Sequence, residues 1–199
     1  MSFDVSPPMV KPMHDTIREW IVEILKCHQN LLAIAVRQRA KFEGWLKFEL
    51  ATVAEQYGAQ SVEVETACDG KNSSGKRSDL SFTFNGNSYV VELKTANSNW
   101  KMQGVHTKER PITNNIAGII EDAQKLSSCC SGQGIVAFVL FPIRLQDNQW
   151  TKYLNHIASK LKISLSEQNH CCHLSVDLGQ NQQADLVVCS FAVEKQKDE

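Results

Sequence analysis

The stretch RSDLSFTFNGNSYVVELK, residues 77–94, predicts two strands joined by a tight turn. Apolar and polar residues alternate on both sides of Asn85-Gly86, a pair that suits a type I′ turn because both of its central positions need φ > 0. Counting outward from this turn places Asp79 directly opposite Glu92. The sequence therefore predicts a β-hairpin in which two carboxylates face each other.

These two carboxylates and Lys94 are expected on one face of the hairpin, because side chains alternate between the two faces of a strand. If the turn were Gly86-Asn87 instead, Asp79 would oppose Lys94, and the three charges would still share that face. Directly opposed like charges destabilise an isolated hairpin. A further group should therefore compensate Asp79 and Glu92.

A divalent cation, Mg²⁺ or Mn²⁺, is the simplest group that would offset the repulsion between these two carboxylates. Proteins usually hold Mg²⁺ with one or two carboxylates, water and substrate phosphate oxygens. Lys94 would project into the same space as Glu92, where an ammonium group can orient water and offset negative charge on a phosphate. These residue types together suit the hydrolysis of a phosphodiester bond.

Residue periodicity predicts the elements on either side of the hairpin. They are a helix over residues 42–58, a strand over 60–66, a helix over 114–128 and a buried strand over 134–143. With the hairpin, the order is α-β-β-β-α-β.

Asp79, twelve intervening residues and then Glu92-Leu93-Lys94, set in this order of elements, resemble the PD-(D/E)XK nuclease superfamily over about residues 40–145. The resemblance implies an α/β fold with a restriction-endonuclease-like αβββαβ core, in which helices flank a central mixed β-sheet. It also implies that Asp79 and Glu92 bind the metal with the Leu93 carbonyl, and that Lys94 helps to position the attacking water.

The first helix of this family often adds an acidic residue to the metal site. Glu43, at the start of the predicted helix, fits that role, and Glu49 and Glu55 on the same helix are the alternatives. The predicted catalytic and metal-binding set therefore includes Glu43.

A basic segment points to nucleic acid, with DNA expected, as the substrate. Residues 71–110 contain seven Lys or Arg and three acidic residues, a balance of +4, although the whole chain carries −1. A local basic patch can neutralise phosphates, and an aromatic side chain beside it can stack on bases. The candidates in and around this segment are Lys71, Lys76, Arg77, Trp100, Lys108 and Arg110. The resemblance adds Gln124 or Lys125 from the helix at 114–128.

The 199 residues are expected to form one domain. Residues 1–40 predict an N-terminal helical extension, and residues 146–199 predict a helix and two strands that could extend the sheet. No apolar run approaches the roughly twenty residues of a membrane span, and seven scattered cysteines favour a reducing compartment. A cytoplasmic protein without membrane contact is the expectation.

Three alternatives stay open. His170-Cys171-Cys172-His173 offers four potential zinc ligands, but adjacent residues point in different directions and converge poorly on one ion. The domain could be a non-catalytic module that binds nucleic acid or protein. A homodimer is possible, since cutting both strands of a duplex would favour two-fold symmetry.

Overall fold

The computed structural model describes residues 11–67, 77–98, 100–106, 112–129, 131–146 and 149–195. Its strands are β1 (Gln60–Ala67), β2 (Arg77–Phe84), β3 (Asn87–Asn97), β4 (Gln133–Ile143), β5 (Cys171–Gly179) and β6 (Gln182–Val193). Its helices are α1 (Met13–Cys27), α2 (Gln29–Gln38), α3 (Glu43–Gln56), α4 (Ile112–Cys129), α5 (Gln149–Leu161) and α6 (Glu167–His170).

In the described ranges the strands form one six-stranded mixed sheet in the order β1-β2-β3-β4-β6-β5. Strands β3 and β4 pair in parallel, and the other neighbours are antiparallel. The predicted α/β class and mixed sheet are therefore confirmed. The two last strands extend the sheet beyond β4, as residues 146–199 suggested.

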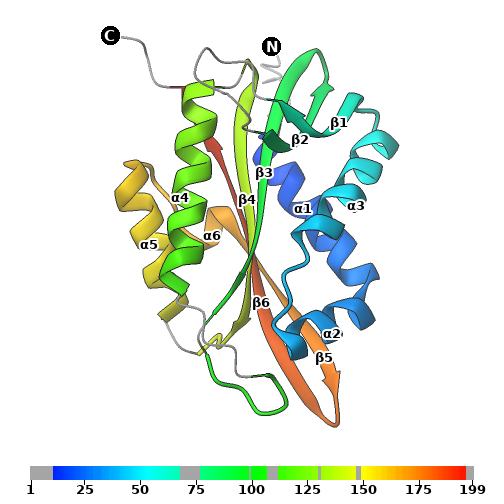
Figure 1. Cartoon of the computed structure of the whole chain (residues 1–199), viewed down its shortest axis with the longest axis vertical. Helices are drawn as coiled ribbons and strands as arrows, with labels where there is room; N and C mark the ends of the chain where they lie inside the picture. The colour runs from blue at the N-terminus through cyan, green and yellow to red at the C-terminus, as the bar shows by residue number, and fades with distance from the viewer. Residues whose placement is uncertain are drawn as a thin grey trace, which may run out of the picture.

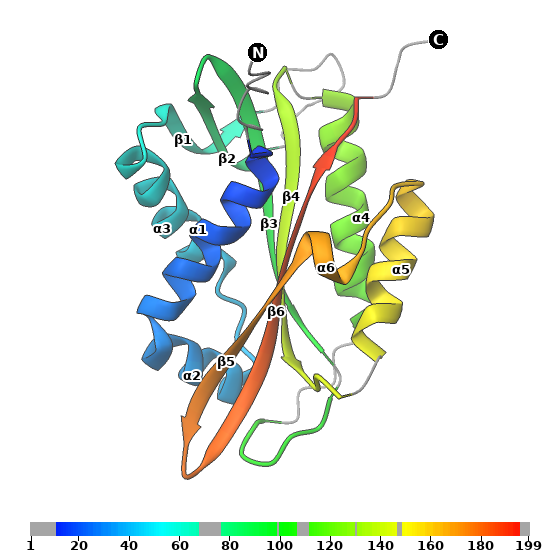
Figure 2. The same cartoon turned by 180° about the vertical axis from the view of Figure 1, so that it is seen from behind.

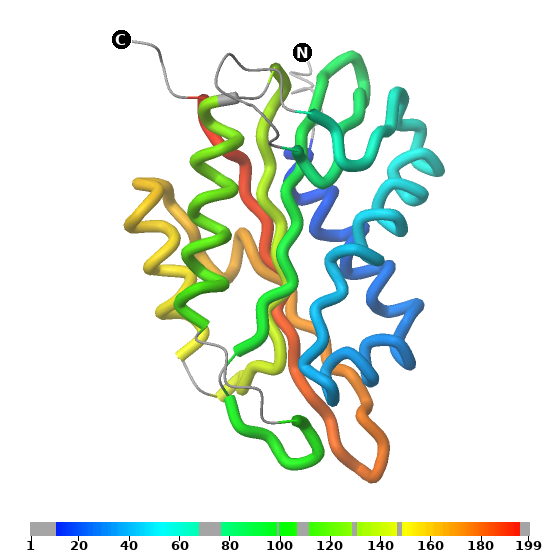
Figure 3. Tube along the Cα trace, in the orientation of Figure 1, coloured from blue at the N-terminus to red at the C-terminus, as the bar shows by residue number. Residues whose placement is uncertain are grey.

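Helices cover both faces of this sheet. Helices α1, α2 and α3 lie on one face, and α4 and α5 lie on the other (Figures 1 and 2). The path of the chain in Figure 3 shows that the N-terminal helices are completed before the hairpin begins. Each helical layer encloses its own group of buried side chains against the sheet. Strand β4 is consequently buried along almost its whole length, which explains its continuous apolar sequence.

The hairpin forms with the predicted turn and register. Asn85 and Gly86 have φ values of 49° and 77°, as a type I′ turn requires, and Leu80 pairs with Val91. The apolar side chains of β2 and β3 that alternate with the charged ones pack toward α1 and α3. The opposite face of the hairpin is thereby turned toward α4.

Candidate active site

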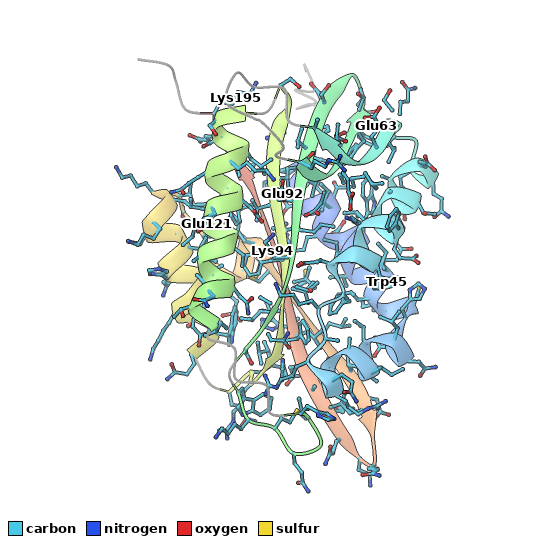
Figure 4. All side chains as sticks on the ribbon, viewed as in Figure 1. Trp45, Glu63, Glu92, Lys94, Glu121 and Lys195 are labelled. Atoms are coloured by element: carbon cyan, nitrogen blue, oxygen red, sulfur yellow. The ribbon has the colours of Figure 1, made fainter. Side chains whose placement is uncertain are left out.

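The charged face of the hairpin lies beneath α4. Continuing the register from Leu80 and Val91 by one residue sets Asp79 opposite Glu92. The Asp79 Oδ2 atom accepts a hydrogen bond from the Leu93 backbone N–H at 2.8 Å. This contact fixes one oxygen of Asp79 beside β3, and Figure 4 shows Glu92 and Lys94 on the same strand next to α4.

Glu92 is almost fully buried, with 3% of its surface exposed. Its Oε1 atom forms an ion pair with the Lys125 ammonium of α4, which also donates a hydrogen bond to the Arg77 carbonyl at 2.6 Å. Burial raises the pKa of Glu92 to about 7; the hydrogen bond from Lys125 opposes this shift, while the charges of Asp122 and Asp79 add to it. The buried carboxyl is therefore poised to change its charge near neutral pH.

Lys94 is held by a second residue of α4. Its Nζ atom lies 2.7 Å from Asp122 Oδ2. Burial lowers the pKa of Lys94, but the hydrogen bond and charge of Asp122, together with the charges of Glu43 and Asp79, outweigh burial and raise the pKa above its ordinary value. Burial likewise raises the pKa of Asp122, against the influence of the two lysines. Lys94 is consequently an ammonium group at neutral pH.

Helix α4 passes close to the Lys94 side chain at Gly118. A Cβ atom built on Gly118 would lie 3.7 Å from the Lys94 Cε atom, which is ordinary van der Waals contact. The aliphatic part of the Lys94 side chain therefore lies beside Gly118, and its ammonium group contacts Asp122 one helical turn further along α4.

Glu43 joins this group from the start of α3. Its Oε2 atom accepts a hydrogen bond from the Thr95 backbone N–H at 3.0 Å, and Lys41 Nζ lies 4.0 Å from its other oxygen. Of the two alternatives on this helix, Glu49 accepts a hydrogen bond from Trp45 Nε1, and Glu55 is exposed. The structure thus brings Glu43 to the hairpin.

The cluster formed by Glu43, Asp79, Glu92 and Asp122 with Lys94 and Lys125 carries more negative than positive charge when every group is ionised. No three His, Cys, Asp or Glu side chains within the described ranges are arranged to hold a metal ion. Asp79 and Glu92, contributed by paired strands, nevertheless supply the one or two carboxylates with which proteins commonly bind Mg²⁺. In donor chemistry the residues fit such an ion, and the excess negative charge favours it.

The residues expected to contact nucleic acid are distributed more widely. Arg77 is exposed at the start of β2, with Nη1 3.7 Å from Glu65 Oε2, and Lys125 is part of the charged cluster. Trp100 follows β3 and lines a cavity that is separate from the charged cluster. Gln124 is exposed and faces a cavity between α4, the end of α5 and β6. Lys71, Lys76, Lys108 and Arg110 lie outside the described residues.

Asp122 is the residue of the cluster that the sequence did not single out, because a polar residue outside the apolar stripe of a helix is usually exposed to solvent. Gly118, Asp122 and Lys125 follow one another at spacings of four and three, so they share a face of α4. A glycine followed by opposite charges at this spacing is the signal that could have identified the face over the hairpin.

The segment His170-Cys171-Cys172-His173 is divided between different surroundings. His173 Nε2 lies 3.0 Å from Glu167 Oε1, whereas Cys171 Sγ lies 2.7 Å from Cys189 Sγ on the paired strand. These side chains therefore face different neighbours.

Comparisons of the chain with models of protein families, with curated proteins and with solved structures found no match. In the part of the chain that the structure describes, no helix is both long and apolar enough to cross a membrane.

Proposed function

We propose that this protein is a divalent-metal-dependent nuclease with a restriction-endonuclease-like αβββαβ core, which hydrolyses phosphodiester bonds in nucleic acid, chiefly DNA. The observation that carries the proposal is the convergence of Asp79, Glu92 and Lys94 on the one face of the hairpin that meets α4. The order helix, three strands, helix and strand around this face is consistent with the resemblance to PD-(D/E)XK nucleases.

Asp79 and Glu92 would hold Mg²⁺ or Mn²⁺, with Glu43 beside them at the start of α3 and the Leu93 carbonyl as a further oxygen donor. When bound, the metal would polarise a phosphoryl oxygen and lower the pKa of a coordinated water. The Leu93 N–H contact orients the Asp79 carboxylate, so this ligand is preorganised by the backbone of β3.

Lys94 acts as a positive group. Because the pKa of Lys94 is raised, its ammonium donates hydrogen bonds to the attacking water and to phosphate oxygens and does not accept a proton. In the overall reaction, the water oxygen forms a bond to phosphorus, the bond between phosphorus and the leaving oxygen breaks, and a proton ends on that leaving oxygen. Asp122 keeps Lys94 in position for this role.

A second function is favoured by the same ion pairs. Lys125 and Lys94 pair with Glu92 and Asp122 in the structure, so two of the four acidic side chains of the cluster have a positive partner without any cation. A non-catalytic module that binds nucleic acid or protein, with these residues serving stability, would have this arrangement.

Cleavage assays separate the two functions. The purified protein is incubated with plasmid, single-stranded DNA and RNA in Mg²⁺, Mn²⁺ or EDTA, beside Asp79→Asn, Glu92→Gln and Lys94→Gln. Glu121→Gln is the matched control, because Glu121 is an exposed acid adjacent to Asp122 in α4. Metal-dependent cutting that the three site variants lose and the control retains supports the nuclease.

Absence of cutting by the folded wild type, with no Mg²⁺ or Mn²⁺ bound in calorimetry, would overturn the nuclease proposal in favour of the binding module. Circular dichroism of each variant shows that a lost activity is not a lost fold.

A further inference from the structure

A cavity of about 200 Å³ lies beyond the ends of β3 and β4, away from the charged cluster. Its lining includes Trp100 from the loop after β3, Arg144 directly after β4, and Gln149, Trp150 and Tyr153 from the first turns of α5. In Figures 1 and 2 this end of the sheet is the one where the loop after β3 and the starts of α4 and α5 meet.

The composition of this lining suits a flat, aromatic ligand. Trp100 and Tyr153, both partly exposed, contribute aromatic side chains on which a nucleobase can stack, and the buried Trp150 completes the aromatic lining. Stacking accepts any base because each has a π-face. Gln149, whose Oε1 atom accepts a hydrogen bond from Lys152 Nζ at 3.2 Å, adds a polar amide to this lining. The cavity is also smaller than the roughly 300–1,000 Å³ of pockets for drug-sized ligands, so its size suits a single ring system.

Arg144 supplies the charge that a nucleotide needs. It is exposed at the mouth of the cavity, immediately after the buried Ile143. A guanidinium group binds phosphate oxygens with two parallel hydrogen bonds. Aromatic walls with an arginine at the rim therefore match a base that remains attached to its phosphate.

The loop that carries Trp100 is held in place by Arg39. This arginine is 5% exposed, and its guanidinium donates hydrogen bonds to the carbonyl oxygens of Ser98 (2.5 Å), His106 (2.6 Å) and Trp100. On the other side, Trp150 is 6% exposed and packs edge-on to His173 at 5.2 Å between ring centroids. The positions of Trp100 and Trp150 in the cavity lining are thus fixed by contacts within the protein.

The cavity is connected to the candidate active site by β3 itself. Ser98, in the cavity wall, follows Lys94 by four residues, which corresponds to about 13 Å along an extended chain. A nucleic-acid strand with one phosphate at Lys94 would therefore reach the cavity within a few nucleotides.

We propose that this cavity binds one unstacked nucleobase of the substrate strand, with Arg144 on the adjoining phosphate, a few nucleotides from the bond that is cut. The location relative to cleavage rests on the proposed nuclease function. The cavity then recognises a single-stranded or extruded nucleotide, which would direct cleavage to strands that can present one.

An abasic-site scan tests the cavity without requiring catalysis. Fluorescently labelled 12-nucleotide DNA and RNA strands, each lacking one base at a different position, are titrated with the full-length protein in EDTA, and binding is read from anisotropy. Wild type should lose about tenfold in affinity when the missing base is the one that occupies the cavity. Trp100→Ala should bind intact and abasic strands equally, and Trp100→Phe should restore part of the difference.

Two further variants separate stacking from charge. Arg144→Gln changes an exposed residue and should weaken every strand alike, while the slope of log affinity against log salt falls by about one. Lys101→Gln, at an exposed position next to Trp100 and outside the cavity lining, is the matched control and should leave the position-specific loss intact.

A scan that is flat at every position, or a Trp100→Ala variant that keeps the position-specific loss, would overturn the cavity proposal. If the wild type cuts nucleic acid but the scan is flat, the nuclease stands and the base site fails. If the scan shows one sensitive position but nothing is cut, the base site stands and the nuclease fails. A wild type that binds none of the strands overturns the base site.

Discussion

The Lys94 ammonium lies 2.7 Å from Asp122 Oδ2, so the lysine of the hairpin and the acid of α4 form an ion pair. A second pair, Glu92 with Lys125, joins the same two elements in the opposite sense, acid on the strand and base on the helix. Because both pairs are largely buried, the helix and the charged face of the hairpin are held in one relative position. Substitutions at either ion pair should therefore affect both the proposed site and the contact between α4 and the hairpin.

Substitution of the proposed metal ligands should abolish cleavage with little change in fold. Asp79→Asn and Glu92→Gln keep shape but lose charge, and the expected loss is at least about a hundredfold in the rate of metal-dependent cutting. Initial rates on plasmid DNA in Mg²⁺ measure it. Glu121→Gln should cut at the wild-type rate, and equal losses in that control would contradict the assignment.

Asp122 is expected to act on the reaction through Lys94. Asp122→Asn removes the charge that holds the ammonium group, so we expect kcat to fall about tenfold while KM for DNA changes little. Steady-state kinetics separate the two constants. A variant with normal kcat would show that Asp122 serves stability alone.

Gly118 should tolerate alanine but not a long side chain. A Cβ atom at this position meets the Lys94 Cε atom at an ordinary 3.7 Å, so Gly118→Ala should keep activity and stabilise the helix by up to about 1 kcal/mol. Gly118→Leu would occupy the space of Lys94 and should reduce cleavage strongly. Thermal unfolding and cleavage rates of the two variants test this contrast, and an active Gly118→Leu enzyme would refute it.

Stability without metal should depend on pH through Glu92. The pKa of this carboxyl rises from 4.5 to about 7 on folding, mainly through burial, so between these values the folded state binds more protons than the unfolded state. Its contribution to stability is fully present below about pH 4.5 and is lost as the pH rises through about 7. From the size of the shift, this loss is about 3 kcal/mol.

Urea unfolding in EDTA at pH 5 and pH 8 measures this dependence. Glu92→Gln cannot titrate and should show a smaller fall in stability between the two pH values than the wild type. An equal fall in both proteins would assign the dependence to other groups.

Arg39 should contribute to stability through the loop after β3. Arg39→Gln leaves the carbonyls of Ser98, Trp100 and His106 without their shared donor, and the expected cost is about 3 kcal/mol in the free energy of unfolding. Arg37→Gln is the control, because the Arg37 side chain donates a hydrogen bond to the Leu178 carbonyl at 2.9 Å, and its loss should cost about 1 kcal/mol. Denaturant unfolding compares the two, and equal costs would contradict the role of Arg39.

Local sequence determined the hairpin and the succession of elements. The turn at Asn85-Gly86 needs backbone angles that these two residues readily adopt, and the turn then sets which residues of β2 and β3 face each other. The helices and the buried strand β4 follow from the spacing of apolar residues. These features depend on residues close together in the chain, so they could be predicted without a structure.

The composition of the charged cluster was decided by tertiary structure. Asp122 and Gln124 are two residues apart and both polar, yet Asp122 meets Lys94 while Gln124 faces α5 and β6. Only the packing of α4 on the sheet sets the rotation that separates them. Trp100, predicted as an aromatic contact to nucleic acid, lines the cavity beyond β3, where the buried guanidinium of Arg39 binds the carbonyl of its loop. Such contacts join residues far apart in sequence, and their free energy depends on burial, which local sequence patterns do not encode.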